Sequence, residues 1–203
     1  MRLRVVALAM AAALVGLGTV PARAQNPYHY EVDFGRAAFA VWEEPRTESF
    51  GFAFVAQGVV YNSDLGGQPM VGVIGCASVS NATTSTFGCG PLSSFSINDD
   101  LGAARGKGTF DALTFDPKTG NTIRRGKISI DLAWTATGDS RPHGDGGYFV
   151  DGTDVGFGTG PAIAREARKV KGRILRSPLG RGPSRLVDGQ IIVGSSISLD
   201  FGG

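Results

Sequence analysis

Residues Lys127 to Thr135 read KISIDLAWT, and this short stretch decides the fold class. Its large apolar side chains fall on every second residue, with polar or small ones between them, and they are Ile128, Ile130, Leu132 and Trp134. A period of two is typical of a β-strand that buries one face and leaves the other in water. The stretch therefore predicts a half-buried strand packed against a core.

The same pattern recurs along the chain. Apolar residues at strand spacing also occur near Phe39 and at 50–54, 70–74, 108–115 and 191–201. The 31 glycines follow no fixed repeat and separate these apolar runs, as tight turns between strands do. We therefore predict an all-β fold, either a single antiparallel β-sandwich or a small closed β-barrel, of roughly 8–11 short strands.

The N-terminus has the features of a secretory signal peptide. Two arginines precede an apolar run from Val5 to Leu17, and the small-residue pattern at 21–24 predicts cleavage after Ala24. The apolar run is shorter than the roughly 20 residues of a membrane-spanning helix, so we expect no transmembrane anchor. We predict that residues 1–24 are a signal peptide of bacterial type, which is removed. Residues 25–203 then form one antiparallel β domain that is exported, either periplasmic or secreted.

The chain has two cysteines, Cys76 and Cys89. An exported protein meets oxidants, and an even number of cysteines then predicts a disulfide. This disulfide would close a loop of about 14 residues and contribute roughly 3 kcal/mol. A metal site would need partners for the thiolates, and the only histidines are His29 and His143. We expect no metal and no cofactor.

A glycine-rich region near residue 150 resembles ligand-binding loops without matching their spacing. The carboxylates of 145–154 do not fall at EF-hand positions in either register. Asp151-Gly152 instead predicts a two-residue hairpin turn with Val150 opposite Thr153. The glycines of 156–160 fit neither the dinucleotide fingerprint nor the P-loop, so we expect no nucleotide.

Basic residues gather toward the C-terminus. Residues 165–203 carry eight basic and three acidic side chains, whereas residues 25–164 carry nine and fifteen. Such segregation can attract an anionic polymer or surface, such as a polysaccharide, lipid headgroups or nucleic acid. The alternative is a solvated strand face whose basic side chains pair with the acidic remainder. The candidate binding residues are Arg165, Arg168, Lys169, Lys171 and Arg173.

The conformation of this basic segment is ambiguous in the sequence. The apolar residues of 162–176 fit either a helix or a strand. Gly172 would cost a helix about 1 kcal/mol relative to alanine, which favours the strand.

No catalytic motif occurs in the sequence. It contains neither a nucleophile elbow nor a zinc-protease pair of histidines. Adjacent carboxylates such as Glu43-Glu44 and Asp99-Asp100 would point to opposite faces of a strand, so neither pair can flank one sugar. We predict an exported, soluble β-domain protein that is not catalytic and has a binding or structural role at the bacterial cell envelope or outside the cell.

Two other functions remain open from the sequence. One is a carbohydrate-binding module that stacks sugars on Trp42, Trp134 or Tyr148. The other is a small secreted hydrolase that uses His143 with Asp145. The oligomeric state is not determined by the sequence.

Overall fold

A computed structural model describes residues 28–62, 70–116, 118–119, 121–143, 146–150, 155–159 and 161–201. These residues form thirteen strands, which confirms the all-β prediction. In chain order they are β1 (Tyr28–Glu44), β2 (Ser49–Asn62), β3 (Met70–Ser80), β4 (Ser85–Pro91), β5 (Ser94–Ile97), β6 (Ala103–Phe115), β7 (Thr122–Thr135), β8 (Arg141–His143), β9 (Gly146–Val150), β10 (Val155–Thr159), β11 (Ala162–Glu166), β12 (Lys169–Arg176) and β13 (Arg185–Phe201). The predicted signal peptide, residues 1–24, lies outside the described residues.

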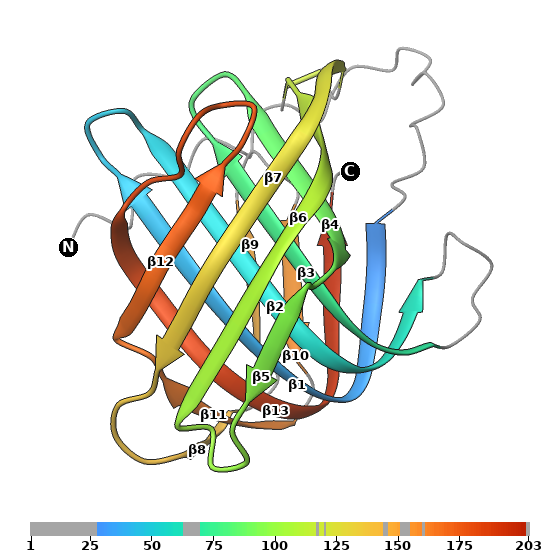
Figure 1. Cartoon of the computed structure of the whole chain (residues 1–203), viewed down its shortest axis with the longest axis vertical. Coiled ribbons are helices and arrows are strands. Elements are labelled where there is room, and N and C mark those ends of the chain that lie inside the picture. The colour runs from blue at the N-terminus through green and yellow to red at the C-terminus, as the bar shows by residue number, and fades with distance from the viewer. Residues whose placement is uncertain are drawn as a thin grey trace, which may run out of the picture.

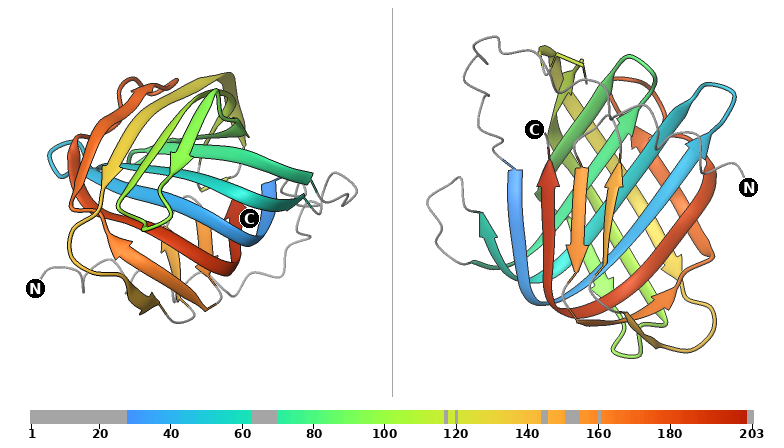
Figure 2. Two further views of the ribbon diagram at one scale, coloured as in Figure 1. Left: turned by 60° about the horizontal axis from the view of Figure 1, so that its bottom comes forward. Right: turned by 180° about the vertical axis from the view of Figure 1, so that it is seen from behind.

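All of these strands belong to one antiparallel sheet. Its main order is β12-β7-β6-β4-β3-β2-β1-β13-β10-β9, while β5 pairs with β6, and β11 pairs with both β8 and β13. The sheet is strongly curled, with β12, β7 and β6 toward the viewer in Figure 1 and β9 and β10 behind them. The view from behind shows β9 and β10 nearest the viewer, beside the bent strands β1 and β13 (Figure 2).

The predicted closed barrel is wrong, because the sheet stays open. Its end strands β12 and β9 do not pair with each other in the described part of the chain. The reason lies in the segment that precedes β12. β11 occupies the free edge of β13, from Ala162 opposite Gly194 to Glu166 opposite Gln190, and the N–H of Ala167 donates to the carbonyl of Gly189. The chain then leaves β13, and β12 pairs with β7 alone. The hydrogen bonds also do not divide the strands into the two sheets of a sandwich.

The stretch KISIDLAWT belongs to β7, and its apolar residues lie in the core. Ile128, Ile130, Leu132 and Trp134 are at most 2% exposed, whereas Asp131 and Thr135 between and beside them lie in solvent. These large side chains face small ones across the interior of the curl, on β1, β2 and β3: Ala38, Ala40, Ala53 and Ala77. Large residues on one wall can pack closely against small ones on the other, as in the interiors of small barrels.

The opposite face of β1 to β4 is buried as well. It carries an aromatic cluster with aliphatic neighbours, formed by Phe39, Phe52, Phe54, Ile74 and Phe87. Ala164 of β11 and Ile192 of β13 pack into the same cluster. Because consecutive residues of β1 and β2 are buried on both faces, these strands form the centre of the molecule.

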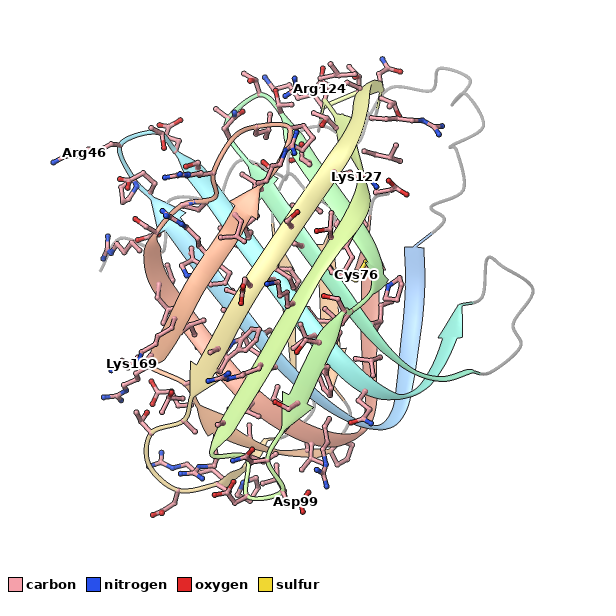
Figure 3. The ribbon with its side chains drawn as sticks, in the orientation of Figure 1. Arg46, Cys76, Asp99, Arg124, Lys127 and Lys169 are labelled. Atoms are coloured by element: carbon pink, nitrogen blue, oxygen red, sulfur yellow. A yellow bond between two sulfur atoms is a disulfide. The ribbon has the colours of Figure 1, made fainter. Side chains whose placement is uncertain are left out.

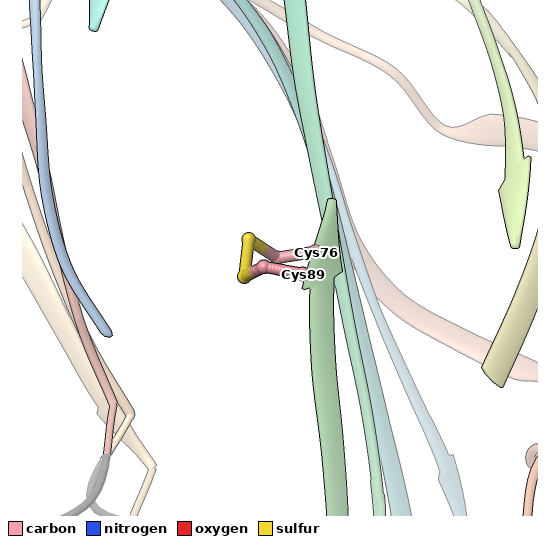
Figure 4. Close-up of a disulfide and its surroundings, with 2 residues drawn as sticks. All are labelled: Cys76 and Cys89. Atoms are coloured by element: carbon pink, nitrogen blue, oxygen red, sulfur yellow. A yellow bond between two sulfur atoms is a disulfide. The ribbon is translucent and has the colours of Figure 1, made fainter. Parts of the chain in front are cut away.

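The predicted disulfide between Cys76 and Cys89 is present. The two residues lie directly opposite each other on β3 and β4, with Cα atoms 4.1 Å apart. Figure 4 shows both sulfur atoms projecting from one side of these strands, and Cys76 belongs to the aromatic cluster. The bond therefore joins two neighbouring strands inside the core and is consistent with an oxidising setting.

Two local predictions have different outcomes. The strand reading of 162–176 is confirmed, since the segment forms β11 and β12. The two-residue turn at Asp151-Gly152 is wrong, because Val150 pairs with Val155 rather than with Thr153. The hairpin register is shifted by two residues from the predicted one. The connecting residues 151–154 lie outside the described residues.

Gly172 allows β12 to approach β7. Its φ is +91°, and a Cβ built on it would overlap the carbonyl oxygen of Asp131. We expect Gly172→Ala to lower the free energy of unfolding by about 2 kcal/mol or more, as measured by urea denaturation. Gly72→Ala on β3 is the matched control, because nothing lies within 4 Å of the added methyl group. Equal stability of the two variants would contradict this account of the β7–β12 contact.

Candidate functional site

The outer sides of β5, β6, β7 and β12 carry the strongest charge pattern of the described residues. Antiparallel pairing aligns their side chains into rows across the sheet. One row is Ser96, Arg105, Ala133 and Lys171; the next is Ser94, Lys107, Asp131 and Arg173; a third is Ala103, Thr135 and Lys169. Because the alternate residues of β6, β7 and β12 face the core, these side chains point outward.

We call this surface the cationic face. It comprises the basic residues Arg105, Lys107, Lys169, Lys171 and Arg173, with Asp131, Ala133 and Thr135 on the strand between them. Neighbouring strands lie about 4.8 Å apart, and residues of one row two strands apart are therefore about 10 Å from each other. Figure 3 labels Lys169 and Lys127, which lie toward opposite ends of this side of the molecule.

The basic charges of the cationic face are mostly uncompensated. Asp131 forms an ion pair with Lys107, with 3.2 Å between Oδ2 and Nζ. No ion pair with another described residue is found for Arg105, Lys169, Lys171 or Arg173. Farther along β7, Lys127 is paired with Asp111 of β6 at 3.0 Å. The three rows thus hold four basic side chains without an ion pair to a described residue, and exposed Arg176, opposite Ser129 in the next row, adds a fifth.

The structure separates the five basic residues singled out in the sequence. Lys169, Lys171 and Arg173 lie together on the outer side of β12, as part of the cationic face. Arg165 lies on β11 and is only 20% exposed. Its Nε and Nη2 donate to the carbonyl of Gly138 at 3.1 and 2.7 Å, and its Nη1 donates to that of Asp100 at 2.9 Å. Arg165 therefore joins three chain segments through its own hydrogen bonds.

Arg168 is also engaged within the protein. Its Nε donates to Oε1 of Glu166 at 2.9 Å, in an exposed pair. This hydrogen bond, assisted by the charge of Arg168, holds the pKa of Glu166 below its ordinary value and raises the pKa of Arg168. The pair marks the corner between β11 and β12.

Two residues of the cationic face, Arg105 and Lys107, were missed in the sequence. They belong to β6, which begins at Ala103 rather than near residue 108 as predicted. The alternation was hidden because the inner positions between them are glycines. A Cβ on Gly106 would lie 2.5 Å from a methyl group of Val55, and one on Gly108 would lie 2.7 Å from the ring of Phe110. The sequence did contain one sign of this strand, because two basic residues flank Gly106 at the spacing of a strand.

The aromatic residues proposed for sugar stacking are largely in the core. Trp42 is 2% exposed and Trp134 is 1% exposed, so neither can stack on a ligand. The side chain of Tyr148, the side chain of His143 and the whole of Asp145 lie outside the described residues. The predicted pairing of His143 with Asp145 in a hydrolase site therefore stays a prediction.

The described residues contain neither a metal-binding cluster nor a membrane-spanning helix. No group of three histidine, cysteine, aspartate or glutamate residues is arranged to hold a metal ion there. The same residues contain no helix of the length and hydrophobicity that a membrane crossing requires.

No family model matches the chain, and no curated protein or solved structure is significantly similar to it. Its function has to be inferred from its own residues, and the cationic face is the feature that supports an inference.

Arg165 and Arg168 differ in burial and in the number of their hydrogen bonds, which allows a stability test. We expect Arg165→Ala to lower the free energy of unfolding by about 2–3 kcal/mol, because it leaves the carbonyls of Gly138 and Asp100 without their charged donor. Arg168→Ala should leave the melting temperature unchanged within error, since its ion pair is exposed. Thermal denaturation followed by circular dichroism measures both. An Arg165→Ala variant as stable as Arg168→Ala would contradict the structural role of Arg165.

Proposed function

We propose that the protein is an exported, non-catalytic binding protein, and that its cationic face holds an anionic polymer or surface at the bacterial cell envelope or outside the cell. The observation that supports this most strongly is the cluster of five basic side chains with a single acid among them. A folded surface that serves only solubility mixes the two signs of charge. Here five basic side chains gather on three adjacent strands, with Asp131 as the one acid in their rows.

The charge of the whole chain makes this local excess informative. If the predicted signal peptide is removed with its three arginines, the 20 basic residues fall to 17, against 18 acidic ones. The remaining protein is close to neutral, so its net charge gives little general attraction to anions. Retention on an anionic partner would then have to come from a local surface.

The disulfide supports export, because such bonds persist in oxidising compartments. The signal-peptide pattern of residues 1–24 agrees with that compartment. A binding role that uses aromatic stacking has less support, because Trp42 and Trp134 are buried. The cationic face therefore supports an electrostatic mode of binding better than a stacking one.

Charge reversal on β12 tests the proposed function. We expect the triple variant Lys169→Glu, Lys171→Glu, Arg173→Glu to elute from a carboxymethyl resin at a much lower salt concentration than the unaltered protein, because the excess positive charge of the cationic face is lost.

The control is a triple variant with the same change of net charge at exposed sites away from this face: Arg46→Glu, Lys118→Glu and Arg181→Glu. It should elute close to the unaltered protein. If both triple variants shift equally, retention follows net charge alone, and the proposed binding face is wrong.

A further inference from the structure

We infer that the partner of the cationic face is a linear polysaccharide that carries carboxylate groups, and that one carboxylate sits over Ala133 between Arg105 and Lys171. This inference rests on the proposed function, because it uses the same face. It goes further by naming the class of ligand and the position of one of its charged groups.

The side chains on either side of Ala133 suit the binding of a carboxylate. Arg105 of β6 and Lys171 of β12 lie opposite Ala133 on its two sides, and neither forms an ion pair with another described residue. Their backbones are about 10 Å apart, so both long side chains can reach above the methyl group between them. Two like charges held at this distance repel each other, and a carboxylate between them adds two attractions over shorter distances that outweigh the repulsion. The guanidinium can also bind a carboxylate through two parallel hydrogen bonds.

The neighbouring side chains carry hydroxyl groups, which match those of a sugar. Ser96 is opposite Arg105 and Ser94 is opposite Lys107, both on β5 at the edge of the face. Thr135 follows Ala133 on the outer side of β7, and Lys169 is its neighbour on β12. The side chains of Ser94, Ser96, Thr135 and Lys169 are all exposed. A surface that alternates cations with hydroxyls offers partners to both the acidic and the neutral groups of an acidic polysaccharide.

A membrane fits this face less well. The bulky exposed apolar side chains near it are Leu175 and Ile123. Leu175 lies beside the Ser129–Ile130 part of β7, and Ile123 is six residues farther along that strand, roughly 20 Å away. They do not form a contiguous patch that could enter a bilayer. The face is also the outer side of a curled sheet, so it curves away from a flat surface (Figure 2).

A single-stranded nucleic acid fits less well for a different reason. Proteins that bind it combine basic residues with aromatic side chains on which the bases stack. None of the three rows of the cationic face contains an aromatic residue. Charge and hydroxyl groups are present without a stacking surface, which favours a saccharide.

Asp131 should limit how closely the carboxylates of the ligand are spaced. It lies two residues from Ala133 on the same side of β7, about 7 Å away. Its ion pair with Lys107 leaves its row with less positive charge than the row of Ala133. A second ligand carboxylate directly over Asp131 would be repelled, so Asp131→Asn should strengthen binding of a polymer that is charged on every sugar.

The test is a calorimetric titration of the purified full protein with polygalacturonate, at low and at moderate salt. Fully methyl-esterified polygalacturonate, phosphatidylglycerol vesicles and single-stranded DNA are the comparison ligands. We expect polygalacturonate to bind most tightly and its methyl ester not to bind. Ala133→Glu should weaken the binding of polygalacturonate by about tenfold or more. Val187→Glu adds the same charge at an exposed position on β13 and should change it by less than about twofold.

Arg105→Gln and Lys171→Gln provide a second measurement that does not alter the half-buried Ala133. If both side chains hold one carboxylate, the loss in affinity of the double variant should differ from the product of the single losses, as expected for coupled residues. Strictly independent effects, or an Ala133→Glu variant that binds as tightly as Val187→Glu, would overturn the position over Ala133. Tighter binding of vesicles or DNA than of polygalacturonate would overturn the choice of ligand while leaving an anion-binding function in place. Failure to bind any of the anions would overturn both.

Discussion

A hydrogen bond across the interior of the curled sheet links the front and back walls of this protein, within the apolar core that packs them together. The indole N–H of Trp134 on β7 donates to the carbonyl oxygen of Phe39 on β1 at 2.8 Å, in a fully buried position. The two strands are far apart in the order of the sheet, with β6, β4, β3 and β2 between them. The bond satisfies the one polar atom of a large buried ring, and an unpaired donor at this place would cost about 1–3 kcal/mol. It also fixes which side of β7 faces inward. Once Trp134 points to the interior, the period of two puts Asp131, Ala133 and Thr135 outside, in line with the basic residues of β6 and β12.

The two halves of the sheet have different roles. The strands β1 to β4 are buried on both faces, with alanines, Trp42 and two valines toward the interior and phenylalanines and the disulfide on the other side. The strands β6, β7 and β12 bury only their inner face, which carries large apolar residues on β7 and mostly glycine and alanine on β6, and their outer face meets solvent. A close approach across the interior, such as that of Gly106 to Val55, is possible because the inner residue of β6 has no side chain. The double-sided half thus acts as a rigid support, and the single-sided half is free to present charged residues in fixed register.

The sequence predicted the parts of this architecture that depend on local periodicity. The alternation of 127–135, the pairing of Cys76 with Cys89, and the strand around Gly172 could all be read from neighbouring residues, because each is set by side-chain direction or by loop length. The openness of the sheet could not, since it depends on β11 occupying an edge of β13 that a closing strand would need. The start of β6 was missed because glycines replace the apolar residues of its inner face. The sequence did not show that Arg105 and Lys107 lie beside Lys169, Lys171 and Arg173, as strand order decides which basic residues become neighbours. It also did not show the hydrogen bonds of Arg165, whose partners Gly138 and Asp100 lie in distant segments.

The central claim is that the outer face of β6, β7 and β12 is the surface that meets a ligand, while β1 to β3 only support it. Backbone amide chemical shifts of the isotope-labelled protein, followed during a titration with polygalacturonate, address this claim directly. The account predicts that the largest changes occur at residues 105–107, 131–135 and 169–173, and that the amides of 37–41 and 52–56 remain unchanged. Changes centred on another surface, with 131–135 and 169–173 unaffected, would contradict it.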